Sequence, residues 1–139
     1  MHTQSENALG AIPNALVPQM LREAHVALFP NRAEGGTNLV AMEAMACGIP
    51  VVLSANTGHL DLIRSDNCYV LTRQSPVSAA NVELGTDGWG ESDPEEIVTT
   101  LEAIYTDWET AQARAAVAAK QMASHSWRNQ IGALFRALG

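Results

Sequence analysis

The sequence predicts an α/β fold in which a parallel sheet is flanked by helices, and three observations support this prediction. Two short apolar runs, at residues 25–29 and 50–53, have the length and composition of strands that are buried on both faces. Between them lie two glycines, a capping residue and an apolar stretch that ends at another glycine, which is the order expected of a loop and a helix. A strand, a helix and a strand in succession almost always form a right-handed parallel unit. The chain has 139 residues, of which 47% are hydrophobic, so it is long enough for one domain with a core.

The first expected elements are a helix over residues 13–24 and the strand over 25–29. Within the helix, Val17, Met20 and Leu21 have the spacing of one apolar face, which we expect to point inward. Pro30 follows the strand and marks its end.

A tight turn is expected after this strand. Gly35 and Gly36 let the backbone turn sharply and approach a ligand closely, because they have no Cβ atom. Thr37 or Asn38 can then cap a helix, since both have a short side chain with an oxygen acceptor.

The helix after this turn is the centre of the predicted unit. Leu39, Met42 and Ala46 fall on one of its faces. Gly48 is suited to end the helix, and Pro50 cannot continue it, so the second strand begins there.

Three shorter features follow the second strand. Residues 57–64 predict a short helix, and residues 68–71 predict a third strand. The segment 73–90 is rich in Ser, Asn, Gly and Asp, so we expect a long loop there.

The last third of the chain predicts three helices. Asp93 has the position of a cap, with Pro94 as the first helical residue and Glu96 as the third. An alanine-rich helix is expected over 109–123, and a last helix after Ser126. One face of the first of these helices is expected to carry Ile97, Leu101, Ile104, Tyr105 and Trp108. The last helix is expected to bury Trp127, Ile131, Leu134, Phe135 and Leu138.

The glycine turn and the helix after it have the chemistry of an anion site. The first N–H groups of a helix lack partners within it, and this end of the helix dipole is positive. Glu34 and Glu43 bracket the segment, and carboxylates can accept hydrogen bonds from sugar hydroxyls. Eight residues separate these two acids, so on one continuous helix nine steps of about 100° would put them on opposite faces. They converge only if Glu34 lies in the loop, so the segment predicts a nucleotide-sugar site with that arrangement.

The sequences Pro-Asn-Arg-Ala-Glu-Gly-Gly at 30–36 and Leu-Val-Ala-Met-Glu-Ala-Met-Ala-Cys-Gly-Ile-Pro-Val at 39–51 resemble a known family. They are similar to the donor-binding C-terminal half of GT-B glycosyltransferases of the retaining type, which include sucrose and bacterial polysaccharide synthases. That family places seven residues between two glutamates, whereas this chain has eight, with the extra residue within 36–38. The loop must therefore bulge or the helix must start later. The resemblance implies a partial Rossmann-like sheet, and it is closest over residues 26–52.

The resemblance also implies roles for individual residues. Glu34 takes the position of a catalytic carboxylate that contacts the donor sugar and steadies charge near the reacting carbon, and Glu43 takes the position that binds the ribose hydroxyls. Backbone N–H groups after the first glutamate meet sugar or diphosphate, which here implies Gly35, Gly36, Thr37, Asn38 and Leu39. Residues 9–13 resemble the loop that faces the nucleobase. Arg32 is the basic residue nearest the motif, and it can pair with phosphate or with Glu34.

Ordinary structural roles stay open beside these assignments. Glu34 can be a surface loop acid, and Glu43 a solvated helix acid. His59 follows the second strand and either borders the site or has a structural role, while Asp61 can cap or orient that turn. Cys47 is expected to pack as a small apolar residue.

Several classes of function find no support in the sequence. There is no phosphate-binding Gly-Lys-Ser/Thr loop, no dinucleotide fingerprint, no zinc-type spacing and no Asp-x-Asp pair, so we expect no cofactor and no metal. The net charge is −7 and the eight basic residues are scattered, which argues against nucleic acid. No segment predicts a membrane span or a signal peptide, and two cysteines without motif spacing fit a reducing compartment, so a cytoplasmic protein is expected.

Residues 1–139 are expected to form a single donor-binding domain that is incomplete at its N-terminal side. The Gly-Arg and Lys pair that steadies the diphosphate in the family has no counterpart here. The expected partners are a nucleotide sugar and either a missing N-terminal acceptor domain or a second copy of the chain, and the isolated chain is expected to be inactive. The expected reaction is metal-independent, retaining sugar transfer. The alternatives are a non-catalytic nucleotide-sugar-binding domain and an interaction domain with the same fold.

Overall fold

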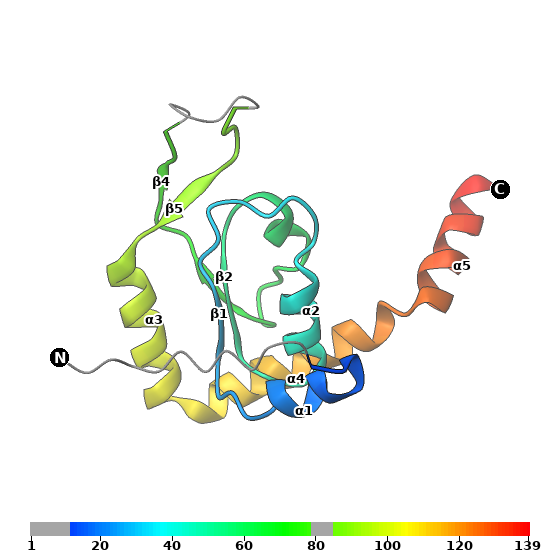
Figure 1. The fold of residues 1–139 in the computed structure, drawn as a ribbon, viewed down its shortest axis with the longest axis horizontal. Coiled ribbons are helices and arrows are strands. Elements are labelled where there is room, and N and C mark those ends of the chain that lie inside the picture. Colours follow the sequence, from blue (N-terminus) through cyan, green and yellow to red (C-terminus); the bar gives the residue numbers. More distant parts are fainter. Residues whose placement is uncertain (1–11, 79–84) are drawn as a thin grey trace.

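A computed structural model gives the fold and describes residues 12–78 and 85–139. Helices lie on both sides of a small central sheet, and a two-stranded ribbon extends beyond it (Figure 1). In chain order the elements are η1 (Asn14–Leu16), α1 (Val17–Leu21), β1 (Ala27–Phe29), α2 (Leu39–Ala46), β2 (Val51–Ser54), η2 (Thr57–Asp61), β3 (Tyr69–Leu71), β4 (Gln74–Pro76), β5 (Gly90–Ser92), α3 (Pro94–Thr106), α4 (Trp108–Ser124) and α5 (Trp127–Leu138).

The central sheet is parallel, as predicted, with the order β1-β2-β3. Ala27 pairs with Val51, and Val52 pairs with Tyr69, so β2 lies in the middle and all its residues are buried. The prediction that the first strand is buried on both faces is wrong, because β1 is an edge strand among the described residues and Leu28 is 37% exposed. The α/β class with a parallel sheet between helices is confirmed.

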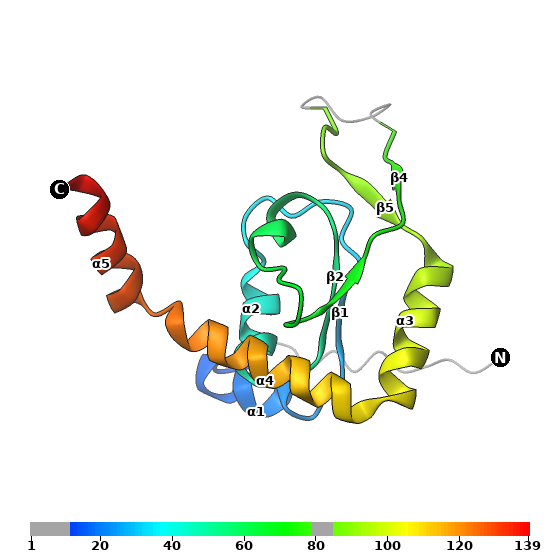
Figure 2. The same cartoon turned by 180° about the vertical axis from the view of Figure 1, so that it is seen from behind.

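Alternate residues of β2 face two separate parts of the core. Val51 and Leu53 pack in a cluster with α2 and α4, whereas Val52 packs in a second cluster with Ile104 of α3 and Ala111 of α4. Figures 1 and 2 agree in placing α2 and α3 on opposite sides of the sheet, with α4 running beneath the amino ends of the strands. The carboxyl ends of the strands are therefore left for the loops.

The buried face of α2 is not the face that the sequence predicted. Ala41, Ala44 and Met45 are completely buried, whereas Leu39 is 73% exposed. Met42 is half-buried and Ala46 is exposed. The pattern was ambiguous because α2 is apolar on most sides, and the small alanines let α4 approach closely.

The predicted stop of this helix is confirmed. Gly48 has a φ of 74°, which glycine adopts without strain. Its N–H donates to the Met45 carbonyl oxygen, and the Ile49 N–H donates to the Ala44 carbonyl oxygen. These two bonds form a Schellman motif that turns the chain into β2.

The prediction of one long loop over residues 73–90 is wrong, because this region contains a strand. Residues 74–76 of this segment form β4, which pairs in antiparallel fashion with β5 at residues 90–92, so that Gln74 lies opposite Ser92. A Cβ atom on Gly90 would meet the Gln74 side chain, which would then have to move. Strands of three residues are too short to show a period in the sequence.

The helices before and after this ribbon follow the predictions in part. The predicted helix over 13–24 is shorter, since α1 ends at Leu21, and the predicted helix over 57–64 is the short 3-10 turn η2. Asp93 caps α3 as expected, because its carboxylate accepts a hydrogen bond from the Glu95 N–H. Ile104 is buried, but Tyr105 is 88% exposed, so the predicted face is too wide.

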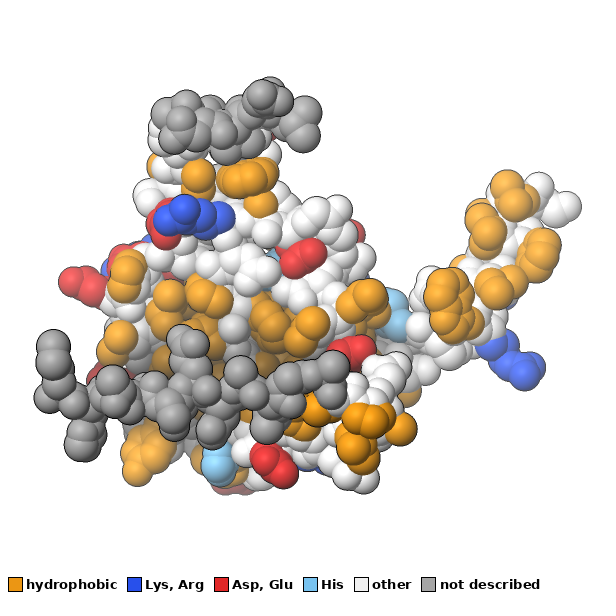
Figure 3. All heavy atoms as spheres, viewed as in Figure 1, with side chains coloured by type: hydrophobic (Ala, Val, Ile, Leu, Met, Phe, Trp, Pro, Cys, Tyr) orange, Lys and Arg blue, Asp and Glu red, His pale blue; other side chains and the backbone are white. Residues whose placement is uncertain are grey.

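The last helix, α5, differs most from its prediction. Ser126 caps it as expected, since its hydroxyl accepts a hydrogen bond from the Asn129 N–H. None of its residues is buried, although its sequence predicted a buried face. Figure 3 shows its apolar side chains along an arm that projects from the body of the molecule. The exposed fractions are 83% for Trp127, 46% for Ile131, 56% for Leu134, 68% for Phe135 and 75% for Leu138.

Candidate functional site

The carboxyl ends of β1 and β2 bring together two segments that are far apart in the sequence. Residues 30–38 follow β1, and residues 54–59 contain the end of β2 and the start of η2. Because the two strands are parallel neighbours, both segments leave the sheet at the same edge (Figure 1). Ligands of open parallel sheets bind beyond this edge. We name residues 30–38 the donor loop, after the role that the resemblance leads us to expect for them, and residues 54–59 the shelf.

The shelf forms hydrogen bonds with both the backbone N–H and the backbone carbonyl group of Glu34. The Thr57 hydroxyl oxygen accepts a hydrogen bond from the Glu34 N–H at 2.7 Å. The Gly58 N–H donates to the Glu34 carbonyl oxygen at 3.2 Å. The Asn31 side-chain amide donates to the Glu34 carboxylate at 3.2 Å, which orients the acid within the loop.

Gly58 lies at a point of close contact between the donor loop and the shelf. A Cβ atom at this position would lie 1.4 Å from the Gly36 carbonyl oxygen and 3.0 Å from the Glu34 carbonyl oxygen. Any side chain would therefore displace the donor loop. By contrast, a Cβ atom on Gly35 or on Gly36 would meet no atom within 4 Å.

His59 is fully buried and holds the start of α2. Its Nε2 atom lies 2.8 Å from the Asn38 side-chain nitrogen, and its Nδ1 atom lies 3.2 Å from the Ser54 carbonyl oxygen. The Asn38 side-chain oxygen caps α2 by accepting a hydrogen bond from the Ala41 N–H at 3.0 Å. Burial lowers the pKa of His59, against the opposing effects of the Ser54 hydrogen bond and the Glu34 charge.

Backbone strain is concentrated in the same place. In the described part of the chain, the non-glycine residues with positive φ are Asn38, at 57°, and Thr57, at 39°. Asparagine tolerates this region, but a β-branched threonine adopts it rarely. Strain of this kind persists where the surroundings fix it, and it is common at functional sites.

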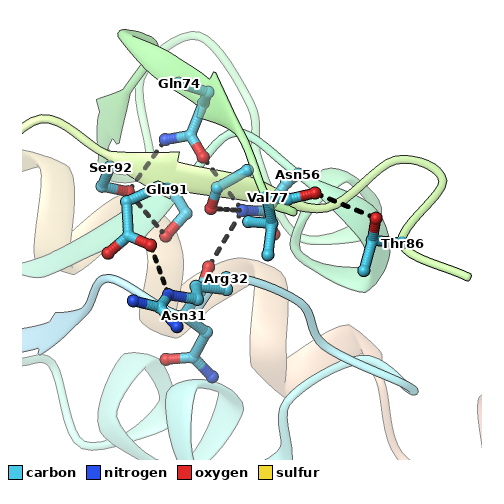
Figure 4. Close-up of polar contacts among 10 residues, drawn as sticks. Asn31, Arg32, Asn56, Gln74, Val77, Thr86, Glu91 and Ser92 are labelled. Atoms are coloured by element: carbon cyan, nitrogen blue, oxygen red, sulfur yellow. Dashed lines mark hydrogen bonds and ion pairs between the residues drawn. The ribbon is translucent and has the colours of Figure 1, made fainter. Parts of the chain in front are cut away.

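Asn56 connects the donor loop to the β4–β5 ribbon (Figure 4). Its buried side-chain nitrogen lies 2.9 Å from the Asn31 carbonyl oxygen, 3.0 Å from the Gln74 side-chain oxygen and 3.2 Å from the Gly90 carbonyl oxygen. The Gly90 N–H in turn donates to the Arg32 carbonyl oxygen at 2.9 Å. The ribbon is therefore attached directly to the loop that carries Glu34.

The structure leaves a run of backbone donors free at the donor loop and the start of α2. None of the N–H groups from Gly35 to Val40 has a hydrogen-bond acceptor among the described residues. Gly35, Gly36, Leu39 and Val40 are exposed. Successive free N–H groups at the positive end of a helix are suited to bind an anion.

The two acids lie on either side of these donors in the sequence, and Glu34 is in the loop before the helix, as predicted. The helix begins only at Leu39, after the left-handed Asn38, so residues 36–38, where the extra residue of the motif lies, belong to the loop. Glu43 is exposed on the second turn of α2. It lines a shallow cavity of about 240 Å³ together with Leu39 and Met122.

Other residues singled out from the sequence have clear places. Asn38, not Thr37, is the helix cap. Arg32 forms an ion pair with Glu91 of β5 (Figure 4), so in this structure it does not pair with Glu34. His59 borders the site through Asn38, and Asp61 is exposed at the end of η2. The expected nucleobase loop at 9–13 lies mostly outside the described residues.

Within the described ranges, 12–78 and 85–139, no group of three or more His, Cys, Asp or Glu side chains is placed to hold a metal ion. An apolar cavity of about 810 Å³ is lined by Leu101, Ile104 and Trp108, and it adjoins His25 before β1, away from the donor loop. Across these same residues, no helix has both the length and the apolar character that crossing a membrane requires.

The sequence singles out only part of the shelf. His59 is a candidate from the sequence, whereas Asn56, Thr57 and Gly58, which hold the loop, are found only in the structure. A signal was present, because Asn-Thr-Gly directly follows a buried strand parallel to the strand that precedes the motif. The loops after neighbouring parallel strands meet at one edge, so polar residues in both are expected to come together.

The comparisons with known proteins concern most of the chain. A family model described as family 4 glycosyltransferase in conflict systems matches residues 14–134. No curated protein matches the chain.

Among solved structures, sucrose-phosphate synthase from Thermosynechococcus elongatus is similar over 93% of this chain and 29% of its own, with 23% identity and a TM-score of 0.68. HepE from Anabaena in complex with UDP is similar over 91% of this chain and 31% of its own, with 20% identity and a TM-score of 0.64. HepE in complex with UDP-glucose is similar over 88% of this chain and 30% of its own, with 20% identity and a TM-score of 0.62. These likenesses show a shared fold, and the chain spans about 30% of the length of the proteins it matches.

Proposed function

The chain belongs to the family 4 glycosyltransferases of conflict systems, and from this premise we propose that it is the donor-binding half of a GT-B glycosyltransferase. The ligand proposed is a nucleotide-diphosphate sugar. One observation supports the proposal: free N–H groups run from Gly35 to Val40 where the chain leaves the carboxyl edge of a parallel sheet, and in the sequence Glu34 and Glu43 flank them. The similar protein HepE is known in complex with UDP and with UDP-glucose, which makes these two compounds the first probes.

Each part of the proposed ligand has a matching group. The diphosphate lies against the N–H groups of Gly35–Leu39, where the helix dipole favours negative charge. The Glu34 carboxylate accepts hydrogen bonds from the sugar hydroxyls, and Glu43 accepts those of the ribose. Arg32 contacts phosphate after it leaves Glu91, its partner here.

The proposed reaction is sugar transfer with retention of configuration and without a metal ion. Retention is proposed from the family resemblance. Positive charge at the start of α2 would stabilise the leaving diphosphate, and donors fixed before the reaction are effective because they need not reorganise. An acceptor-binding domain, or a second copy of the chain, would supply the other side of the active site. A non-catalytic nucleotide-sugar-binding domain with the same fold is the second candidate, because the free N–H groups that would bind the diphosphate do not by themselves require a transfer step.

Calorimetric titration with UDP and UDP-glucose tests the binding proposal. Glu43→Gln is expected to weaken binding by about ten- to a hundredfold, since a hydrogen bond to a charged group contributes about 1.5–3 kcal/mol. Glu34→Gln is expected to weaken UDP-glucose more than UDP, because Glu34 is assigned to the sugar. Glu102→Gln, an exposed acid of α3, is the matched control. Equal affinity in all four proteins, or no binding, would contradict the proposal, and binding without transfer to any acceptor would favour the second candidate.

A further inference from the structure

We propose that His59 is a positioning residue for the donor loop, and that it holds the loop in its ligand-binding form only while its imidazole is neutral. This inference rests on the proposed function for its effect on binding. It depends on three hydrogen bonds that link β2, η2 and α2 through buried side chains.

The hydrogen bonds determine the protonation state of His59. Its Nδ1 atom faces the Ser54 carbonyl oxygen, which can only accept, so Nδ1 carries the proton. Its Nε2 atom faces Asn38 at 2.8 Å. The Asn38 oxygen is already engaged with the Ala41 N–H, so its nitrogen is the atom that donates to Nε2. The imidazole is therefore neutral in this arrangement.

A second proton on His59 would disrupt this chain of bonds. Nε2–H would then face the Asn38 NH₂ group, and two donors would stand 2.8 Å apart. If the Asn38 amide flips, its oxygen accepts from Nε2–H, but its nitrogen then faces the Ala41 N–H and the cap of α2 is lost. In either case the left-handed backbone of Asn38 loses one of the two side-chain hydrogen bonds that hold it.

The effect reaches the free N–H groups because Asn38 lies within their run. Gly35–Thr37 precede it, and Leu39 and Val40 follow it at the start of α2. The surroundings oppose protonation, since His59 and Asn38 are both buried. The charged group that acts on His59 is the Glu34 carboxylate of the donor loop, which favours the proton, while Ser54 and Asn38 are uncharged. Burial outweighs this attraction and keeps the pKa of His59 below its usual range.

UDP-glucose affinity as a function of pH tests the inference in the full chain. Neither phosphoryl group of this compound changes charge between pH 5 and 8, so the profile reports on the protein. Below the His59 pKa, affinity is expected to fall by about tenfold per pH unit, because only the neutral fraction binds. His59→Gln keeps an acceptor near the Nε2 position and is expected to bind at neutral pH without this fall. His25→Gln, a change of an exposed histidine before β1, is expected to follow the native profile.

Nuclear magnetic resonance gives a readout that needs no ligand. At neutral pH, the ¹⁵N shifts of His59 are expected to show the Nδ1–H tautomer. On acidification, the amide signals of Gly35 and Gly36 should move with the His59 titration in the native chain and stay in place in His59→Gln. Asn38→Asp is expected to raise the His59 pKa, because a carboxylate oxygen would face Nε2.

The two measurements separate the failure of this inference from that of the proposed function. If UDP-glucose does not bind at any pH but the loop amides follow His59, the proposed function fails and the positioning role stands. Parallel pH profiles in the native chain and in His59→Gln would overturn the positioning role. An Nε2–H tautomer at neutral pH, or loop amides that do not respond to His59, would overturn it as well.

Discussion

The donor loop with its shelf and the helix α5 are opposite cases in one chain. The donor loop is polar and glycine-rich, yet the shelf holds it through Thr57, Gly58 and His59. Helix α5 has a sharper apolar stripe than α2, α3 or α4, and none of its residues is buried. An apolar stripe indicates that a face can be buried but does not say by what, whereas a hydrogen bond between two loops fixes both partners.

The strongest test of this contrast is Gly58→Ala. Its new methyl group would collide with the Gly36 carbonyl oxygen, so the loop or η2 must move. We expect a loss of at least about 3 kcal/mol in the free energy of unfolding, or failure to fold. Gly35→Ala is the matched control, since it adds the same methyl group in open space and is expected to change stability by less than about 0.5 kcal/mol. Urea denaturation measures both, and a tolerated Gly58→Ala would contradict the close contact.

Truncation of one apolar side chain in the core and one in α5 compares how much each contributes to the free energy of unfolding. Met45→Ala removes a completely buried side chain and is expected to cost about 2–5 kcal/mol. Leu138→Ala removes one that is 75% exposed and is expected to cost less than about 0.5 kcal/mol in the isolated chain. Similar losses in the two variants, measured by urea denaturation, would show that α5 packs against something in solution.

A smaller effect is expected in the pH dependence of stability. Because burial holds the pKa of His59 below its ordinary value of about 6.5, the unfolded chain takes up the proton more readily than the folded chain. The free energy of unfolding is therefore expected to fall as pH drops below about 6.5, and to level off below the folded pKa. The difference between the native chain and His59→Gln isolates this contribution. A constant difference from pH 8 to pH 5 would contradict it.

The smallest effect is expected at the start of α5. Ser126→Ala removes the cap that accepts from the Asn129 N–H, so α5 should lose protection of its amides against hydrogen exchange. The free energy of global unfolding is expected to stay within about 0.5 kcal/mol of the native value, because α5 contributes no buried residue. A larger global loss would show that α5 is part of the cooperative unit.

The sequence predicted those features whose cause is local. The stop at Gly48 and the caps at Asp93 and Ser126 follow from single residues, and the parallel strands follow from the order of apolar runs. The position of Glu34 before the helix followed from the count of residues to Glu43.

Features that depend on distant partners were not predictable in the same way. The ribbon of β4 and β5 depends on pairing across residues 77–89, and its strands are too short to show alternation. The burial of Ala41 rather than Leu39 depends on the approach of α4, which no pattern within α2 contains. Prediction of the shelf requires the knowledge that the loops after β1 and β2 meet at one edge of the sheet.

The central claim is that the N–H groups of the donor loop and the start of α2 bind the diphosphate of a nucleotide sugar. Titration of the ¹⁵N-labelled chain with UDP at neutral pH measures this directly, because an N–H that donates to phosphate changes its chemical shift strongly. We predict the largest changes at Gly35–Val40, with little change in α3 and α5. Unchanged signals from Gly35–Val40 at millimolar UDP, or changes confined to the apolar cavity beside α3, would contradict the account.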